Sequence, residues 1–216
     1  MVAAAIAGVL ACTATATAGG DAIRVQMTRA DQIAARAALL RQADVGDPAL
    51  WESAAETPDV STALRCPDFQ PKVSDLVVTG AAAVRYRQPG LVMHSISEVF
   101  RTAKMLDLAW QRSAASPHYL GCVQSFARRV LTPPIERFVS FRRLSVPRIG
   151  SRTEGFRTLV EVKTADGPVR VVIDTLRAVR ERTQISLTTT IPLTSVPKRW
   201  AQELVLLEKL VGRTRA

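Results

Sequence analysis

Alternating apolar and polar positions, together with runs of β-branched residues, predict strands in the second half of the chain. These segments span residues 138–146, 155–164, 169–176 and 183–191. β-Branched side chains fit a pleated, half-buried surface, and Asp166-Gly167, between the middle two segments, is typical of a tight hairpin turn. Residues 82–99 predict a further hairpin, turned at Pro89-Gly90. The pattern therefore indicates a sheet built mainly of antiparallel strands.

Helical spacing marks the N-terminal and central parts of the chain. An alanine-rich helix is predicted over residues 29–43, with Thr28 as its N-cap and Asp31 in its first turn. A second helix should follow Thr102. A third should begin at Ser116-Pro117, because a cap residue followed by proline favours a helix start, and it should stop at Pro133-Pro134. Between the first helix and the hairpin, residues 47–75 show no period and predict a long irregular connection.

A final helix is predicted over residues 197–211, capped by Ser195. Its apolar stripe consists of Trp200, Leu204, Leu207 and Val211. In the strand 155–164, Phe156 and Val160 share one face, whereas Arg157 and Glu161 share the other. We expect the final helix to cover the drier face. The predicted fold is α+β, an antiparallel β-sheet flanked by helices, in a single domain spanning residues 28–213.

The first 18 residues predict an export leader. An uncharged apolar run from Val2 to Leu10 precedes Cys12 and then Ala16-Thr17-Ala18. Residues 9–12 approximate a lipobox, so cleavage before Cys12 would leave an acylated, membrane-anchored cysteine, whereas cleavage after Ala18 would release the protein. Both routes stay open. The run is too short to span a bilayer, and its lack of a preceding basic region indicates that the natural start lies upstream of Met1.

Export also determines how the cysteines are interpreted. Once a leader is removed, Cys66 and Cys122 remain, and an even pair in an oxidising compartment favours one disulfide. Cys66 would then restrain the irregular connection. The alternative is two buried free thiols. Neither cysteine has a second ligand at the spacing of zinc sites, so no metal and no cofactor is predicted.

The net charge of the chain is +10, with 29 basic against 19 acidic residues. Outside a cell such an excess favours anionic lipid or acidic wall polymers as partners, and nucleic acid is not expected. Eight arginines fall within residues 128–157. The anion-binding candidates among them are Arg142, Arg143, Arg148 and Arg152. Because Arg142 and Arg143 are adjacent in a strand, they should point to opposite faces. The alternative is an ordinary solvated surface.

Catalytic motifs are scarce. His94 and His118 are the only histidines, and no Gly-x-Ser-x-Gly elbow is present. No pair of carboxylates has a spacing that forces the two groups together across a sugar cleft. The sequence therefore predicts a protein that is not an enzyme. The alternative is a secreted hydrolase with an unrecognised site around one of the histidines.

The order of these features resembles a known family. An exported leader, the helix after Thr28, the motif Ser97-Glu98-Val99-Phe100-Arg101-Thr102-Ala103, a cysteine after the following helix, and residues 169–191 closing on a helix are similar to small secreted or lipid-anchored proteins of high-GC bacteria. These are similar to PsbP-like lipoproteins and to the extracellular sensor domain of receptor serine/threonine kinases. The resemblance implies a helix-flanked antiparallel sheet, disulfide bracing and a ligand-binding groove. We therefore expect a non-enzymatic, exported cell-envelope protein with a sensor-like domain that binds a ligand or partner.

Overall fold

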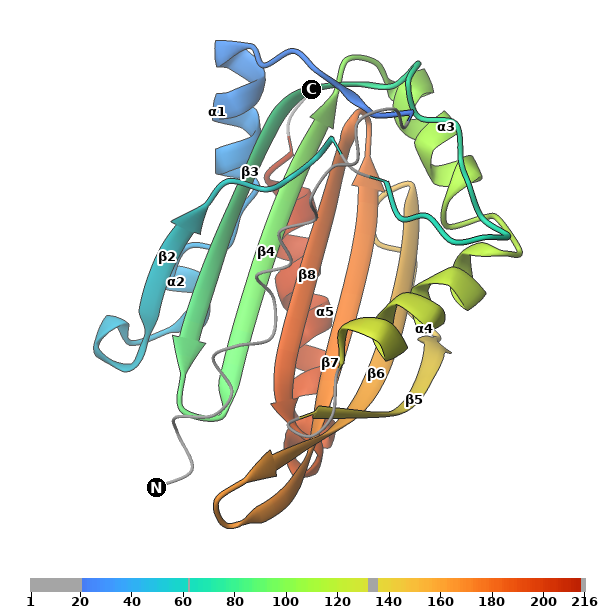
Figure 1. Ribbon diagram of the computed structural model, residues 1–216. Coiled ribbons are helices and arrows are strands. Elements are labelled where there is room, and N and C mark those ends of the chain that lie inside the picture. The colour runs from blue at the N-terminus through green and yellow to red at the C-terminus, as the bar shows by residue number, and fades with distance from the viewer. Residues whose placement is uncertain (1–20, 62, 132–135, 215–216) are drawn as a thin grey trace.

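The computed structural model describes residues 21–61, 63–131 and 136–214, and over these residues its centre is an open sheet of eight strands (Figure 1). The strands are β1 (Arg24–Val25), β2 (Glu52–Glu56), β3 (Val77–Gln88), β4 (Leu91–Phe100), β5 (Glu136–Leu144), β6 (Arg152–Thr164), β7 (Gly167–Arg180) and β8 (Thr183–Pro192). Their order is β1-β3-β4-β8-β7-β6-β5, with β2 also paired to β3. All pairs are antiparallel except β1 with β3. The predicted α+β class and antiparallel sheet are confirmed.

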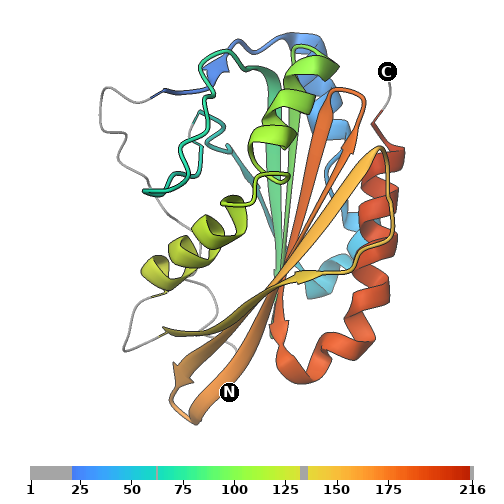
Figure 2. The ribbon, with the colours of Figure 1, turned by 90° about the vertical axis from the view of Figure 1, so that its right-hand side faces the viewer.

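Helices cover both faces of the sheet (Figure 2). The helices are α1 (Arg29–Ala37), α2 (Gln42–Val45), α3 (Ala103–Arg112), α4 (Tyr119–Val130) and α5 (Val196–Gly212), with short 3-10 turns at Pro48–Leu50 and Leu193–Ser195. In Figure 2, α1 and α5 lie on one side of the strands, whereas α3 and α4 lie on the other. We call these sides the α5 face and the α3–α4 face.

Local signals placed most elements correctly. The side chain of Thr28 accepts a hydrogen bond from the Asp31 amide at 3.2 Å, as a helix cap does. The hairpin at Pro89-Gly90 joins β3 to β4, and Gly90 has φ 75°, a left-handed conformation that glycine adopts without steric cost. The predicted hairpin at Asp166-Gly167 joins β6 to β7. The predicted stop at Pro133-Pro134 lies outside the described residues.

The first helix is shorter than predicted and the connection after it is less irregular. The helix ends at Ala37, because Leu39 and Leu40 turn inward and become buried. The amide of Leu40 also donates a hydrogen bond to the Ser95 hydroxyl at 3.4 Å. Strand β2 was not predicted, because its sequence Glu-Ser-Ala-Ala-Glu has little strand propensity. It forms by pairing along its length with β3.

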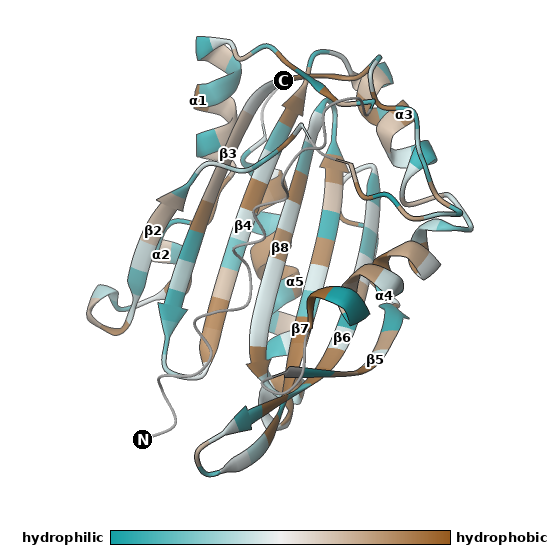
Figure 3. Ribbon diagram, viewed as in Figure 1, coloured by the Kyte–Doolittle hydropathy of each residue, from teal (hydrophilic) through white to brown (hydrophobic). Residues whose placement is uncertain are grey.

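The prediction of which face α5 covers was wrong. Along the strands, apolar and polar residues alternate (Figure 3), but both faces are covered and both contain apolar clusters. Helix α5 packs on the face that carries Arg157 and Leu159, through Leu207 and Leu210. The charge of Arg157 is tolerated there because the buried Asp174 binds it, with Nε to Oδ1 at 2.7 Å. The drier face, with Phe156, packs instead against α4.

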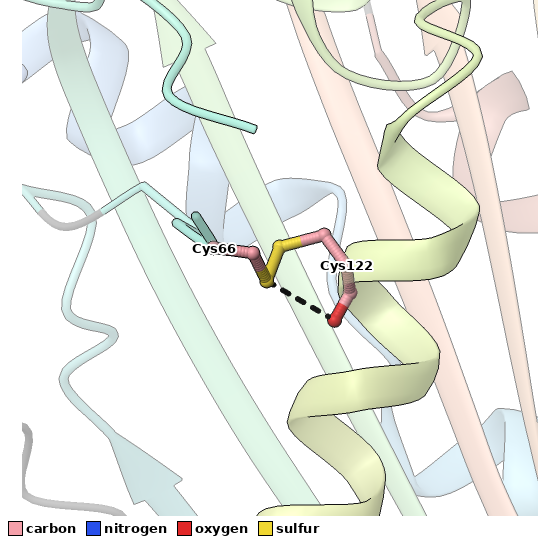
Figure 4. Close-up of a disulfide and its surroundings, with 2 residues drawn as sticks. All are labelled: Cys66 and Cys122. Atoms are coloured by element: carbon pink, nitrogen blue, oxygen red, sulfur yellow. Dashed lines mark hydrogen bonds between the residues drawn. A yellow bond between two sulfur atoms is a disulfide. The ribbon is translucent and has the colours of Figure 1, made fainter. Parts of the chain in front are cut away.

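The predicted disulfide joins Cys66 in the long connection to Cys122 in α4, with 5.6 Å between their Cα atoms (Figure 4). Around it, the rings of Phe69, Tyr119 and Phe156 pack edge to face, with centroids 5.7 and 5.9 Å apart. Such aromatic pairs stabilise a core beyond the area that they bury. The bridge and this cluster therefore hold the connection and α4 against the α3–α4 face of the sheet.

Candidate functional site: an arginine-lined pocket

A pocket of about 480 Å³ lies where the turn between α3 and α4 meets the end of β5 and the start of β6. We call it the arginine-lined pocket. Its lining includes apolar residues, which we call the apolar wall, and three arginines, which we call the basic wall. Its lining residues are Trp110, Ala114, Ala115, Ser116, Pro117, Leu120, Arg143, Val146, Arg148, Ser151, Arg152 and Thr153. Its volume is within the range of about 300–1,000 Å³ that is usual for small-molecule sites.

Three of the four candidate arginines border this pocket: Arg143, Arg148 and Arg152. Arg142 does not, because it pairs in register with Arg157 and so belongs to the α5 face. Arg143 pairs in register with Phe156 and belongs to the α3–α4 face. The predicted opposite orientation of the two adjacent arginines is therefore confirmed.

The segment that carries Arg148 is fixed to the sheet. The Ser151 amide and hydroxyl both donate to the carbonyl oxygen of Val179 in β7, at 2.8 and 2.9 Å. Gly150 lies so close to that strand that a Cβ atom would be 2.4 Å from the same oxygen. Its φ of 76° is also a glycine conformation. Arg148 itself is exposed and forms no ion pair with any described residue.

Arg148 also borders a second, neighbouring pocket of about 400 Å³. Arg180 of β7 and Glu208 of α5 also line that pocket. Arg148 therefore lies at the boundary between the two pockets.

Only one of the two terminal nitrogens of Arg152 is paired, with an acidic residue on α3. Its Nη2 lies 2.9 Å from Oδ1 of Asp107. Its Nη1 is buried and has no hydrogen-bond partner among the described residues. A buried donor without a partner carries an uncompensated desolvation cost of about 1–3 kcal/mol. An oxygen acceptor that reached this nitrogen would remove that cost.

A buried carboxylate lies behind the basic wall. Glu154 of β6 is 2 % exposed, and its Oε1 lies 2.9 Å from Nη1 of Arg177 in β7. Its Oε2 lies 3.6 Å from Nη2 of Arg143. Burial raises the pKa of Glu154, while the charges of the two arginines act to lower it. Arg177 is thus the close partner of Glu154, and Arg143 is only a distant one.

Arg177 connects the pocket to a polar network on the same face. Its Nη1 donates to the Tyr119 hydroxyl at 2.7 Å, and its Nη2 donates to Oε1 of Gln184 at 2.9 Å. Gln184 in turn donates to Oε2 of Glu98 at 2.6 Å. The guanidinium also lies 5.4 Å from the ring centroid of Trp110, within cation–π distance. Arg177 therefore contacts both Trp110, which belongs to the apolar wall, and Glu154, which lies behind the basic wall.

Sequence reasoning missed the acidic partners Asp107 and Glu154. Asp107 comes from α3, far along the chain from Arg152, so spacing gives no hint of that pairing. Glu154 had a usable signal, because it precedes Phe156 and Val160 on the dry face of its strand and lies opposite Arg177 in the β6–β7 hairpin. A carboxylate in such a row is costly to bury unless it pairs with a cation or stays protonated.

The two histidines lie on different elements. His94 lies in β4 on the α3–α4 face, with its Nε2 3.0 Å from Oε2 of Glu56, which also binds Arg85. Burial lowers the pKa of His94. His118 precedes α4 as its N-cap residue. Over the described residues, neither imidazole forms a hydrogen bond with a serine or threonine hydroxyl.

Two further features bear on the predicted class of protein. Over the described residues, no group of three histidine, cysteine or acidic side chains is arranged to hold a metal ion. No helix in that part of the chain combines the length and apolar character needed to cross a bilayer. Cys12 and the predicted leader lie outside the described residues.

Comparison with known proteins gives little guidance on identity. No protein-family model matches the sequence, and no curated protein matches it. A solved structure of an uncharacterized protein from Mycobacterium smegmatis (Rv0999 ortholog) is similar at a TM-score of 0.46 and 11 % sequence identity, over 86 % of this chain and 98 % of that one. This similarity is distant, and function has to be argued from the site.

Proposed function

We propose that this protein is a non-enzymatic, exported cell-envelope protein that binds an anionic ligand in the arginine-lined pocket. One observation carries the proposal: three arginines border one pocket. They are Arg143 at the end of β5, Arg148 in the connection after it, and Arg152 at the start of β6. Guanidinium groups bind phosphate and carboxylate through paired hydrogen bonds. The resemblance to PsbP-like lipoproteins and to kinase sensor domains supports a sensor-like, ligand-binding role.

Export is supported by the cysteine chemistry. The Cys66–Cys122 disulfide is typical of proteins from oxidising compartments. The apolar run and the small residues up to Ala18 are typical of an export leader. In the envelope, a pocket that attracts anions would meet lipid head groups and acidic wall polymers rather than nucleic acid.

Removing two charges from the pocket should abolish most anion binding. In the double variant Arg143→Gln/Arg148→Gln, we expect the affinity for 1-naphthyl phosphate and naphthalene-1-sulfonate to fall about tenfold or more, because a hydrogen bond to a charged group contributes roughly 1.5–3 kcal/mol. Isothermal titration calorimetry on the oxidised protein measures this. Arg142→Gln is the matched control, since it removes an exposed arginine from the same strand but from the opposite face. Equal losses in control and double variant, or no anion binding by the wild type, would contradict the proposal.

The proposed export predicts a processed chain. Intact-mass spectrometry of the native protein should give either a mature chain beginning at Gly19 or a chain beginning at an acylated Cys12. The first result makes the protein a free secreted factor and the second a membrane lipoprotein. A full-length, unprocessed chain recovered from the cytosol would overturn the assignment to the envelope.

A further inference from the structure

The charges around the arginine-lined pocket do not cancel. Asp107 neutralises Arg152 at 2.9 Å, and Glu154 neutralises Arg177 at 2.9 Å. Arg148 has no acidic partner among the described residues, as shown above. This leaves two guanidinium groups without a close carboxylate: the one on Arg148 and the one on Arg143.

Arg143 is only a loose ion-pair partner of Glu154. The closest approach between the two is 3.6 Å, whereas charge-assisted hydrogen bonds are about 2.7–2.9 Å long. The side chain of Arg143 is also 52 % exposed, whereas that of Glu154 is fully buried. Arg143 and Arg148 therefore both keep donors free for a ligand at the basic wall of the pocket. A ligand with a single negative charge would leave one guanidinium unpaired.

The apolar wall favours an apolar group on the same ligand. Trp110 is 8 % exposed and is held in place by Arg177. Leu120, Pro117 and Val146 extend this apolar surface around the pocket. Such a surface gains free energy only when it is removed from water, which a bare inorganic anion cannot do.

We infer that the arginine-lined pocket binds a phosphate monoester whose organic group is apolar. The phosphate lies against Arg143 and Arg148, within reach of Arg152, and the apolar group lies against Trp110 and Leu120. A phosphate monoester carries about −1.5 to −2 charges at neutral pH, matching the two uncompensated guanidinium groups. This inference rests on the proposed function and names its ligand class. The ester is either a free small molecule or the head group of a lipid phosphate.

Three probes test the two halves of this inference. We expect 1-naphthyl phosphate to bind the wild-type protein at least tenfold more tightly than naphthalene-1-sulfonate, which has the same ring and one charge, and than inorganic phosphate, which lacks the ring. Calorimetry at pH 7.5 measures all three affinities. Equal affinity for the sulfonate would overturn the phosphate assignment, and equal affinity for inorganic phosphate would overturn the apolar half. In either case the proposed anion-binding function survives, whereas binding of none of the three removes both proposals.

Variants locate the preference in the pocket. Arg148→Gln should reduce the preference for the phosphate over the sulfonate to about threefold or less, because one of the two uncompensated charges is gone. Arg142→Gln, on the opposite face, should keep the full preference. Arg148 is exposed, so its replacement does not disturb the core. An unchanged preference in Arg148→Gln would overturn the inference.

Vesicles distinguish the two sources of the ester. Sedimentation with phosphatidylcholine vesicles containing phosphatidic acid is compared with that of vesicles containing phosphatidylglycerol, a diester, at equal surface charge. Pelleting with phosphatidic acid alone supports a lipid phosphate. Tight binding of 1-naphthyl phosphate without pelleting supports a free ester. Equal pelleting with both anionic lipids, lost equally in Arg142→Gln and Arg148→Gln, would overturn recognition of a monoester.

Discussion

Replacing Cys66 and Cys122 with alanine should lower the free energy of unfolding by about 4 kcal/mol. The bridge closes a loop with a sequence separation of 56 residues, and a cross-link of that span removes this much loop-closure entropy from the unfolded chain. Cys122 is 3 % exposed, so a small cavity at this position adds to the loss. Urea denaturation of the oxidised wild type and of the double variant measures the difference.

The wild type under reducing conditions serves as the control, because it breaks the same bond without removing side-chain volume. It should show most of the loss. The untreated native protein should also take up no iodoacetamide at either cysteine. A difference below about 1 kcal/mol between the oxidised wild type and the double variant would mean that the connection and α4 are held by packing alone.

The bridge also affects the pocket. Pro117 and Leu120 line the pocket, and Leu120 lies in the same first turns of α4 as Cys122. The Tyr119 hydroxyl, which accepts from Arg177, belongs to that part of α4 as well. Loss of the disulfide loosens the helix that positions both the apolar wall and the Arg177 network. We therefore expect the disulfide to contribute both to the stability of this face and to the shape of the site.

Predictions from local signals succeeded where neighbours in the sequence determine the structure. The cap at Thr28 and the turn at Pro89-Gly90 involve only residues a few positions apart, so sequence patterns identify them. Strand β2 was missed because its own residues do not favour a strand, and only pairing with β3 makes it one. The end of α1 depends on burial of Leu40, which no helical period shows.

Predictions failed where the outcome depends on which charged side chains pair with each other between elements. The position of α5 was predicted from the dryness of one strand face, and it was wrong because Asp174, from the next strand, neutralises Arg157. The arginine cluster itself was visible as a local excess of one residue type. Which members share a pocket depended on register and on the turn between α3 and α4, and their partners depended on tertiary contacts.

Because Asp174 binds Arg157, a second buried acid, Glu203 of α5, has no cation of its own. Glu203 and Asp174 are each 1 % exposed, and Arg157 is engaged by Asp174 through two hydrogen bonds. Burial, followed by the charge of Asp174, raises the pKa of Glu203 from 4.5 to about 8, against the opposing effects of Arg157 and Thr189. Glu203 is therefore protonated in the folded protein at neutral pH and ionised in the unfolded chain.

This difference gives the folded state more bound protons than the unfolded one between pH 4.5 and about 8. The contribution of Glu203 to stability is complete below the unfolded value and is lost as the pH rises through the folded value. The slope is about −1.4 kcal/mol per pH unit within that window, and it flattens above the folded value. The lowered pKa of His94 has the opposite effect, but that effect ends near the ordinary value of 6.5. Burial also raises the pKa values of Glu98 and Glu154, so the difference in slope between the wild type and a Glu203 variant reports Glu203.

Glu203→Gln should remove this dependence, because the amide keeps the size of the side chain and cannot ionise. We expect its free energy of unfolding to fall less steeply from pH 7 to 9 than that of the wild type and to exceed it at pH 9 by about 2 kcal/mol or more. Urea denaturation at several pH values measures both slopes. Glu208→Gln is the matched control, since Glu208 lies on the same helix but is exposed, and it should keep the wild-type slope. Parallel slopes in the wild type and Glu203→Gln would mean that water reaches the carboxyl and that α5 does not seal this face of the sheet.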